Sequence, residues 1–274
     1  MRIDSHVHFW KYDRTRLDWI DNSMKVLQKD YLPSELSGTL NRNDVDGVIA
    51  VQAEQSEVET LFLVELAKSY PLIKGVVAWV DLRAANVAER LDYMSQFTII
   101  KGYRHIVQTE PAGFMDDQSF RNGIAALAAF DLSYDILIYP NQLQEAARLV
   151  QAFPGQRFVI DHCAKPDIKQ PLNAEWVKGM EQMAEYPNVQ CKLSGLFTEA
   201  KWKSWSAGDF YPFLDVVFKA FGTDRLMFGT DWPVILLSGM YVQWKSLLEK
   251  YMENLVPEIK DQVFGLNAAA FYKI

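Results

Sequence analysis

Hydrophobic residues along the chain gather in short runs that alternate with longer segments of helical period. The runs are rich in Val, Ile and Phe, and some, such as VIAVQA and DILIY, are almost continuously apolar. Such runs predict strands, and continuous apolarity is typical of a parallel sheet buried on both faces. The eight predicted strands are Arg2–Phe9, Gly47–Ala53, Ile73–Val80, Thr98–Arg104, Ser133–Tyr139, Arg157–Asp161, Val189–Leu193 and Leu226–Gly229.

The segments between these runs predict helices. Val58–Ser69, for example, has apolar residues at positions 58, 61, 62, 63, 64, 66 and 67. Each segment is long enough for a right-handed crossover between parallel strands. Eight such units favour a closed barrel over an open sheet, so the predicted fold is α/β, a (β/α)₈ TIM barrel. The other predicted helices are Ser119–Ala129, Gln142–Ala152, Ala174–Glu185, Phe210–Ala220 and the tail Pro257–Phe271.

Length and composition fit one globular domain over residues 1–274. The hydrophobic fraction of 49% is sufficient for a large core, and barrels of about 250 residues commonly form one domain. The net charge of −7 and the absence of a Lys/Arg run argue against a nucleic-acid partner. Without a secretory signal or a long apolar run, we expect a cytoplasmic protein that does not associate with membranes. We expect Cys163 and Cys191, which form no CxxC motif, to be buried thiols.

Two long segments between predicted elements are rich in tryptophan. They are Lys11–Leu32, which contains Trp19, and Lys201–Asp209, which contains Trp202 and Trp205. Each suits a lid over one barrel end, a surface loop packed on its own side chains, or a contact in a homo-oligomer. These three interpretations remain open at the level of sequence.

The first predicted strand carries two histidines. His6 and His8 in DSHVHF are two positions apart, so their imidazoles project to the same side of a strand. Such a pair suits a divalent cation, an oxyanion or a water molecule. Both lie near the carboxyl end of the strand, which is the rim where barrel enzymes build their active sites.

Two later motifs end on the same predicted rim. VIDHCAKP places Asp161 and His162 at the end of the sixth strand, and MFGTDWP places Asp231 at the end of the eighth. In a closed barrel the eighth strand lies beside the first. Taken alone, His162 suits a hydrogen-bonded core histidine and Asp231 a turn or a helix cap. Together with the histidine pair they predict one site at one barrel mouth.

These motifs, with others in the same order, resemble the amidohydrolase superfamily, specifically the amidohydrolase-related branch that contains sugar-acid lactonases and a pyrone-dicarboxylate lactonase. The resemblance covers nearly the whole chain. It implies a (β/α)₈ barrel of the metal-dependent-hydrolase type, with hydrolytic chemistry at its C-terminal rim. It is carried by DSHVHFW at 4–10, LDWI at 17–20, YLPSEL at 31–36, GVIAVQAEQSEVET at 47–60, KGVVAWVDL at 74–82, KGYRH at 101–105, FVIDHCAKP at 158–166, NVQCKLSGL at 188–196 and RLMFGTDWPV at 225–234.

The resemblance also implies a metal site, from which this chain departs in one respect. Relatives with two metals have a bridging lysine on the fourth strand and histidines ending the fifth and sixth, but here the fifth predicted strand ends in Tyr139. Lys101 on the fourth strand is expected to be structural. A binuclear centre is therefore not expected, whereas one divalent ion, preferably zinc, and catalysis without metal both remain open. The residues assigned to catalysis, and to a metal where one is bound, are His6, His8, His162 and Asp231.

A lactone is an internal ester, so its hydrolysis needs an activated water, a stabilised oxyanion and a proton for the leaving alkoxide. Asp231 is the expected general base, and the three histidines, directly or through a metal, would polarise the carbonyl. Other rim residues are candidates for binding the substrate, although packing, capping or surface ion pairs account for each of them too. They are Arg104, His105, Tyr139, Trp232, Gln52 and Trp79.

Hydrolysis of a small lactone, most simply a sugar-acid lactone, is the function that the sequence favours. A decarboxylase or hydratase acting on an unsaturated dicarboxylate is the second hypothesis, and the missing fifth-strand histidine counts against it. The third is a non-catalytic barrel that binds a sugar acid. The presence of both histidines together with Asp231 counts against it, because binding alone does not need a base.

Overall fold

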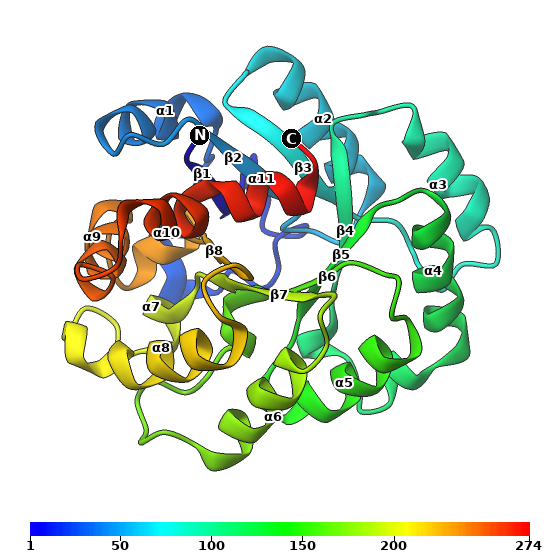
Figure 1. The fold of residues 1–274 in the computed structure, drawn as a ribbon. Helices are drawn as coiled ribbons and strands as arrows, with labels where there is room; N and C mark the ends of the chain where they lie inside the picture. Colours follow the sequence, from blue (N-terminus) through cyan, green and yellow to red (C-terminus); the bar gives the residue numbers. More distant parts are fainter.

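The computed structural model describes residues 1–274 as eight parallel strands ringed by helices (Figure 1). Each strand pairs with its neighbours in sequence, in the order β1 to β8, and the predicted (β/α)₈ architecture is thereby confirmed. The strands are β1 (Ile3–Val7), β2 (Gly47–Val51), β3 (Ile73–Ala78), β4 (Ile100–Ile106), β5 (Ser133–Leu137), β6 (Phe158–Ile160), β7 (Val189–Leu193) and β8 (Leu226–Phe228).

The helices cover the outer face of the sheet, and several begin at polar capping residues. The side chains of Ser56, Asp117 and Asn173 accept hydrogen bonds from backbone amides in the first turns of α2, α4 and α6. None of the helices combines the length and apolarity that crossing a membrane requires. Their bounds are α1 (Pro33–Arg42), α2 (Glu57–Ser69), α3 (Val87–Ser95), α4 (Gln118–Ala129), α5 (Leu143–Ala152), α6 (Ala174–Ala184), α7 (Leu196–Glu199), α8 (Ala207–Phe221), α9 (Tyr241–Tyr251), α10 (Pro257–Asp261) and α11 (Asn267–Tyr272).

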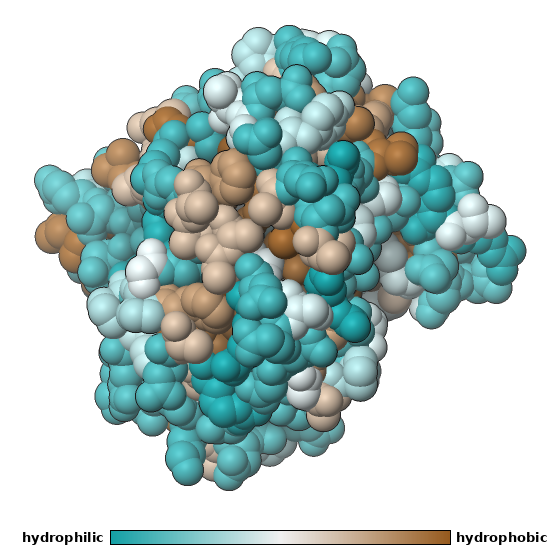
Figure 2. Space-filling model, turned by 90° about the vertical axis from the view of Figure 1, so that its right-hand side faces the viewer, coloured by the Kyte–Doolittle hydropathy of each residue, from teal (hydrophilic) through white to brown (hydrophobic).

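Most of the core lies between the sheet and the helices, where apolar side chains of both layers pack together. The outward faces of the helices are largely polar. Figure 2 shows one side of the molecule, on which hydrophilic residues cover most of the surface and strongly hydrophobic ones form small groups. This core between the sheet and the helices therefore holds the helices against the barrel. A separate set of side chains fills the barrel interior.

The barrel closes where the chain just beyond β8 runs beside β1. The amide of Asp231 donates to the carbonyl of His6 at 2.8 Å, and the amide of His8 donates to the carbonyl of Trp232 at 2.7 Å. Backbone hydrogen bonds thus join the two ends of the sheet at the predicted histidine pair and the predicted aspartate.

The barrel interior changes from apolar to charged along its axis. Apolar side chains of the strands, such as Ile3, Val77 and Met227, pack inside the barrel with Phe271 and Tyr272 of α11, which crosses the barrel in Figure 1. Toward the carboxyl ends, the buried polar side chains of the strands include His6, Arg104, Asp135 and Lys192. Helix α11 therefore plugs one end of the barrel, and polar groups occupy the other.

The predicted elements agree with the structure apart from local differences. Strand β4 begins and ends two residues later than predicted, and β6 stops at Ile160, before Asp161. The helical tail is interrupted by a π-helical turn at Gln262–Leu266, where the backbone of Gly265 approaches the first residues of the chain. A Cβ on Gly265 would lie 2.2 Å from the carbonyl oxygen of Met1, so no larger residue fits. Periodicity alone does not reveal α1, α3 and α9.

We predict that Gly123→Ala destabilises the fold although alanine favours helices. Gly123 lies within α4, and a Cβ there would meet the carbonyl oxygen of Leu82 at 2.2 Å. Alanine gains up to about 1 kcal/mol of helix propensity, whereas forcing atoms into a filled space costs about 1–3 kcal/mol. A lower urea midpoint of unfolding is expected. Gly155→Ala is the matched control, since a Cβ there meets nothing within 4 Å; equal midpoints for the two variants would contradict the prediction.

Candidate active site

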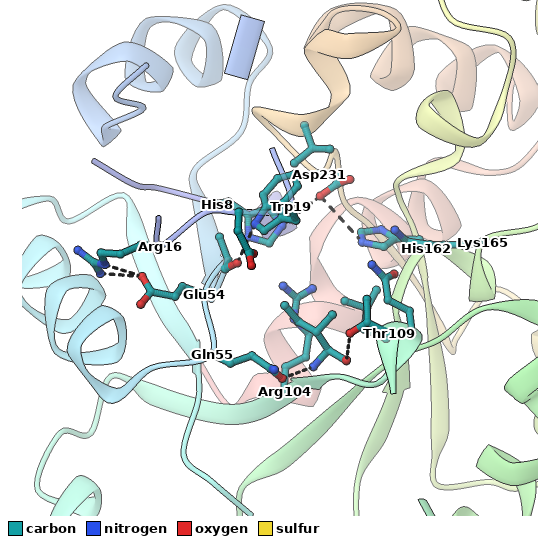
Figure 3. Close-up of a pocket in the computed structure, with 16 residues that line it drawn as sticks. His8, Arg16, Trp19, Glu54, Gln55, Arg104, Thr109, His162, Lys165 and Asp231 are labelled. Atoms are coloured by element: carbon teal, nitrogen blue, oxygen red, sulfur yellow. Dashed lines mark hydrogen bonds and ion pairs between the residues drawn. The ribbon is translucent and has the colours of Figure 1, made fainter. Parts of the chain in front are cut away.

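A cavity of about 380 Å³ opens at the carboxyl ends of the strands. In Figure 3, His8, Asp231 and His162 lie along one side of the cavity, and Arg104 lies across from them. These four residues lie on or just after four different strands, so the barrel brings together positions that are far apart in sequence. The rest of the lining consists of Arg16, Asp18, Trp19, Ala53, Glu54, Gln55, Ile106, Gln108, Thr109, Leu137, Lys165 and Val234.

An irregularity in β1 orients the two histidines. Asp4 pairs with Val48 and Val7 pairs with Ala50, so β1 contains one more residue than β2 over this stretch. Such a bulge shifts the alternation of side chains by one position. Ile3 packs inside the barrel, and after the bulge the even-numbered His6 and His8 come together, with their Nε2 atoms 3.2 Å apart.

A hydrogen bond identifies the free nitrogen of His8, whereas both nitrogens of His6 face donors. The Nδ1 atom of His8 lies 2.8 Å from the carbonyl oxygen of Val51, which can only accept, so Nδ1 carries the proton and donates. Arg104 Nη1 lies 3.2 Å from His6 Nε2 and Lys192 Nζ lies 3.2 Å from His6 Nδ1, so both nitrogens of this ring face cationic donors. Burial lowers the pKa of His6 well below its usual value, which keeps the ring neutral.

Asp231 lies beside both rings. Its Oδ1 atom is 3.1 Å from His8 Nε2, 3.8 Å from His6 Nε2 and 3.9 Å from His162 Nε2. Burial alone would raise the pKa of Asp231, but His162 and His8 outweigh burial and bring it below the usual range. Its second oxygen, Oδ2, makes no hydrogen bond within the protein. Asp231 is therefore a carboxylate with one oxygen beside the histidines and one available to another molecule.

His162 is held in place by an unusual backbone turn. His162, Cys163, Ala164 and Lys165 all have positive φ angles, and together they turn the chain sharply after β6. The Nδ1 atom of His162 lies 2.9 Å from the hydroxyl of Ser194, and burial lowers the pKa of His162 to about 4. The same turn delivers both His162 and Lys165 to the cavity.

Arg104 forms part of the cavity wall, but its hydrogens are already used. Nε donates to Gln52 Oε1, Nη2 donates to the carbonyl and side-chain oxygens of Gln52, and Nη1 donates to Asp161 Oδ2 and His6 Nε2. A guanidinium has five N–H groups, so all five have partners. Arg104 supplies fixed positive charge at this wall, and a substrate would have to displace an existing bond to be held by it.

A buried group of charges lies beneath the cavity. Lys192, fully buried, contacts Asp135 Oδ2 at 2.5 Å, Asp161 Oδ1 at 3.0 Å and His6 Nδ1 at 3.2 Å. Burial would raise the pKa of Asp161, but Lys192 and His6 lower it well below the usual range. Asp135 also accepts a hydrogen bond from Tyr272 at 2.8 Å. Asp135 and Lys192 are not among the predicted site residues, although a charged residue in the middle of a strand covered on both faces is an available signal.

The histidines and Asp231 fit a divalent cation. The ligand atoms of His6, His8 and Asp231 lie within 4.8 Å of one another. Tetrahedral zinc, with bonds of about 2.0–2.1 Å to nitrogen, needs ligand atoms about 3.3 Å apart. The separations of 3.1, 3.2 and 3.8 Å among these three atoms are of that size. Three convergent acceptors without a proton between them repel one another, and a cation would remove that repulsion.

A second candidate group, of His6, Asp161 and His162, is less suited to a cation. Asp161 already contacts two positive side chains, Arg104 and Lys192. No histidine follows β5, where Leu137 lines the cavity. The charge that a second metal would neutralise is therefore already balanced by the protein.

The other predicted substrate-binding residues lie outside the cavity lining. Gln52 is buried against Arg104, Trp232 packs on Phe9 and Tyr31, and the indole of Trp79 points to His105 at 3.4 Å. His105 in turn contacts Glu110 at 2.8 Å. Tyr139 is exposed, with Lys165 over its ring, and Lys101 lies away from the cavity, near Lys273 at the end of the chain.

The long first segment supplies three cavity residues, of which the sequence singled out only Trp19. Arg16, Asp18 and Trp19 all line the cavity. The Arg16 guanidinium pairs with Glu54 at 2.7 Å, as the dashed lines in Figure 3 show, and the Trp19 indole donates to the carbonyl of Ala53 at 3.1 Å. The segment is thus fastened to the loop after β2. Lys201–Asp209, the other tryptophan-rich segment, contributes nothing to the lining.

Comparison with known proteins gives the family, two lactonases of similar sequence and a solved structure of similar fold. A family model described as amidohydrolase matches residues 3–274. The chain is 39% identical to an L-fucono-1,5-lactonase of Burkholderia multivorans and 32% identical to one of Burkholderia ambifaria, covering 100% of this chain and 96% of each relative. A solved amidohydrolase structure from Burkholderia multivorans with bound zinc superposes with a TM-score of 0.97, at 39% identity, over 100% of this chain and 99% of that one.

We predict that Gly195→Ala displaces the His162 ring. Gly195 has a φ of +66°, and a Cβ there would lie 2.5 Å from Cγ of His162. The left-handed conformation alone costs a non-glycine residue about 1–2 kcal/mol. A lower unfolding midpoint is expected, and a crystal structure of the variant should lack the 2.9 Å contact between His162 Nδ1 and Ser194.

Gly208→Ala is the control for this substitution, because the nearest atom to a Cβ there is Ser206 Oγ at 3.8 Å. It should retain the His162 contact and should not lower the unfolding midpoint, because alanine favours helices and Gly208 lies within α8. An intact contact in Gly195→Ala, at wild-type stability, would refute the inferred role of the glycine.

Proposed function

This chain belongs to the amidohydrolase family, and from that premise we propose that it hydrolyses the ester bond of a sugar-acid lactone. The observation that carries the proposal is the convergence of His8, His162 and Asp231 on one cavity, with Asp231 Oδ2 free of protein partners. Relatives named L-fucono-1,5-lactonase, similar over the whole length, support the same reaction type.

The cavity suits a small polar ring. Its volume of about 380 Å³ lies at the lower end of the range for small-molecule sites. Asp18, Gln55, Gln108 and Thr109 offer hydrogen-bonding groups for hydroxyls, and the half-buried Trp19 offers an aromatic surface for ring carbons. A lactone derived from a single sugar meets both requirements.

Asp231 acts as the general base in this proposal. Its Oδ2 accepts a proton from a water molecule while the water oxygen attacks the lactone carbonyl and forms a tetrahedral oxyanion. When the intermediate collapses, the ring C–O bond breaks and the proton on Asp231 passes to the leaving alkoxide. The product is an open-chain hydroxy acid, whose carboxyl group releases one proton to the solvent near neutral pH.

Lys165 and His162 stabilise the oxyanion. The Lys165 ammonium lines the cavity, and its nearest carboxylate, on Glu199, is 3.9 Å away, so its hydrogens remain available to a substrate. This assigns to Lys165 the contact with substrate that the sequence suggested for Arg104, whose five hydrogens already have partners. A preorganised donor in a site of limited hydration stabilises developing negative charge strongly.

We further propose that the site holds one zinc ion, with His6, His8 and Asp231 as the protein ligands. A bound divalent ion would polarise the carbonyl and lower the pKa of a coordinated water. A similar solved structure, at 39% identity, contains zinc and supports this assignment.

Asp231→Asn should abolish turnover while leaving the fold intact, because an amide cannot accept the proton of the attacking water. The measurement is a pH-indicator assay on a panel of aldonolactones, with circular dichroism to confirm folding. Residual activity above about 10% of wild type would remove Asp231 from the role of base.

Asp81→Asn is the control, since this carboxylate also follows a barrel strand but lies outside the cavity and caps the amide of Arg83. It should retain activity. The same assay tests the reaction class, because ring opening releases a proton whereas decarboxylation consumes one. No acidification with any lactone, together with turnover of a dicarboxylate, would refute the proposed function.

Purified protein should contain about one zinc per chain, and His8→Ala should lose it, because three ligands at this spacing are needed to hold the ion. Elemental analysis after dialysis, followed by competition with a chromogenic chelator, measures both content and affinity. His105→Ala, at a histidine that contacts Glu110 instead, is the control. Equal zinc content in the two variants would refute the ligand assignment.

A further inference from the structure

We infer that Arg16 and Glu54 determine the specificity of the active site: as an ion pair they bind two neighbouring hydroxyl groups of the substrate, and they thereby favour uncharged polyhydroxy lactones over lactones that bear a carboxylate. Both residues line the cavity, and neither is bonded to the histidines or to Asp231. The inference rests on the proposed lactone hydrolysis, to which it adds the protein groups that bind the substrate away from the reacting carbonyl.

The cavity has two chemically different ends. Figure 3 places His162 and Lys165 at one end and the pair of Arg16 and Glu54 at the other, with His8 between them. The first end carries the groups proposed to act on the lactone carbonyl. A lactone whose carbonyl lies beside Lys165 therefore directs the carbons farthest from that carbonyl toward the ion pair.

The hydrogen-bonding capacity of the ion pair is only partly used. Arg16 directs Nε and Nη2 to a single oxygen of Glu54, Oε2, at 2.8 and 2.7 Å. A guanidinium has five N–H groups, so one on Nη2 and both on Nη1 have no partner in the protein. Glu54 Oε1 accepts no hydrogen bond either. The pair thus presents unused donors and an unused acceptor on neighbouring groups of the cavity wall.

Two hydroxyl groups on adjacent carbons of a sugar ring match this arrangement. A hydroxyl both donates and accepts, so one hydroxyl can accept from the Arg16 guanidinium while its neighbour donates to Glu54 Oε1. Hydrogen bonds to ionised groups are shorter and stronger than those between neutral groups. The pair can therefore contribute strongly to binding of a polyhydroxy ring, and it has nothing to bind on a ring without hydroxyls.

The charges at this end of the cavity disfavour a carboxylate on the substrate. Arg16 is already neutralised by Glu54, and Asp18, from the same segment as Arg16, adds another negative charge to the cavity wall. A carboxylate on the far carbon of the substrate would meet these two acids, and placing like charges together costs binding energy. An aldonolactone, whose far carbons are uncharged, meets no such repulsion.

Attachment of the first segment to the barrel does not account for the pair. The Arg16 side chain is 43% exposed, and ion pairs with an exposed member contribute little to stability. The segment has other attachments, among them the hydrogen bond from the Trp19 indole to Ala53 and the backbone bridge between Trp10 and Tyr31. Removing the ion pair should therefore leave the segment in place, so binding and structural roles can be separated.

The experiment compares Arg16→Met and Glu54→Met with wild type in the pH-indicator assay. The two substrates are the six-membered aldonolactone that wild type opens most efficiently and δ-valerolactone, the same ring without hydroxyls. We expect each variant to raise KM for the aldonolactone at least about tenfold, with kcat within about threefold, and to leave kcat/KM for δ-valerolactone within about threefold. Arg14→Met, in the same segment but outside the cavity, is the matched control and should behave as wild type.

Selection by charge is tested with a third substrate, the counterpart of the aldonolactone that is oxidised to a carboxylate at its far carbon. Wild type should open it at least about tenfold less efficiently than the aldonolactone. Glu54→Met leaves Arg16 without its acid, so this variant should open the carboxylate-bearing lactone more efficiently than wild type and the aldonolactone less efficiently. A variant that discriminates between the two lactones as strongly as wild type would refute selection by charge.

A crystal structure of Asp231→Asn with the aldonolactone bound provides a readout that does not depend on turnover. Two hydroxyls should contact the Arg16 guanidinium and Glu54 Oε1. A bound ring whose hydroxyls contact neither residue would overturn the inference, as would equal losses on the aldonolactone and δ-valerolactone, because such losses report displacement of the segment. If wild type opens no lactone, the proposed function itself fails. If wild type opens lactones and both variants match it, the inference alone fails.

Discussion

Closure of the barrel between β1 and the chain after β8 is the constraint on which the site depends. The hydrogen bonds that join these segments involve the backbone of His6, His8 and Asp231 themselves. The distances between their side chains are therefore set by the closure of the sheet. Asp4 adds to this junction: its carboxylate accepts the amide of His6 and the amide and hydroxyl of Thr230. A site built this way is rigid before a substrate arrives, which is what preorganised catalysis requires.

The sequence was sufficient to predict the barrel and the convergence of its four main site residues. Apolar runs identify strands because a sheet covered on both faces excludes polar side chains, and the rim position of His162 and Asp231 follows from strand ends. The orientation of His6 and His8 was less accessible. Spacing shows that they share a side, but which side depends on the extra residue in β1, and a bulge leaves no distinct signal in DSHVHF.

Side-chain partners across strands were also beyond sequence reasoning. Arg104 was expected to bind substrate because it ends a strand at the rim, yet Gln52, Asp161 and His6 use all its hydrogens, and no pattern along the chain reports such pairing. Lys165 was missed for the opposite reason. It follows the sixth strand by several residues, and only the run of positive φ angles from His162 onward returns it to the cavity.

The charges inside the barrel and the loops at its mouth carry different parts of the function. A buried carboxylate, lysine and arginine beneath the cavity are costly to desolvate and are retained where they hold reacting groups in one geometry. The segment of residues 11–32 contributes none of these buried charges. It is attached to the loop after β2 through Arg16, which pairs with Glu54, and through Trp19, which donates to Ala53. The side chains of Arg16, Asp18 and Trp19, which line the cavity, take no part in the backbone bonds between β1 and the chain after β8. We therefore expect the choice among lactones to reside in this segment and the reaction itself to reside in the barrel, because only the barrel fixes Asp231 and the histidines relative to one another.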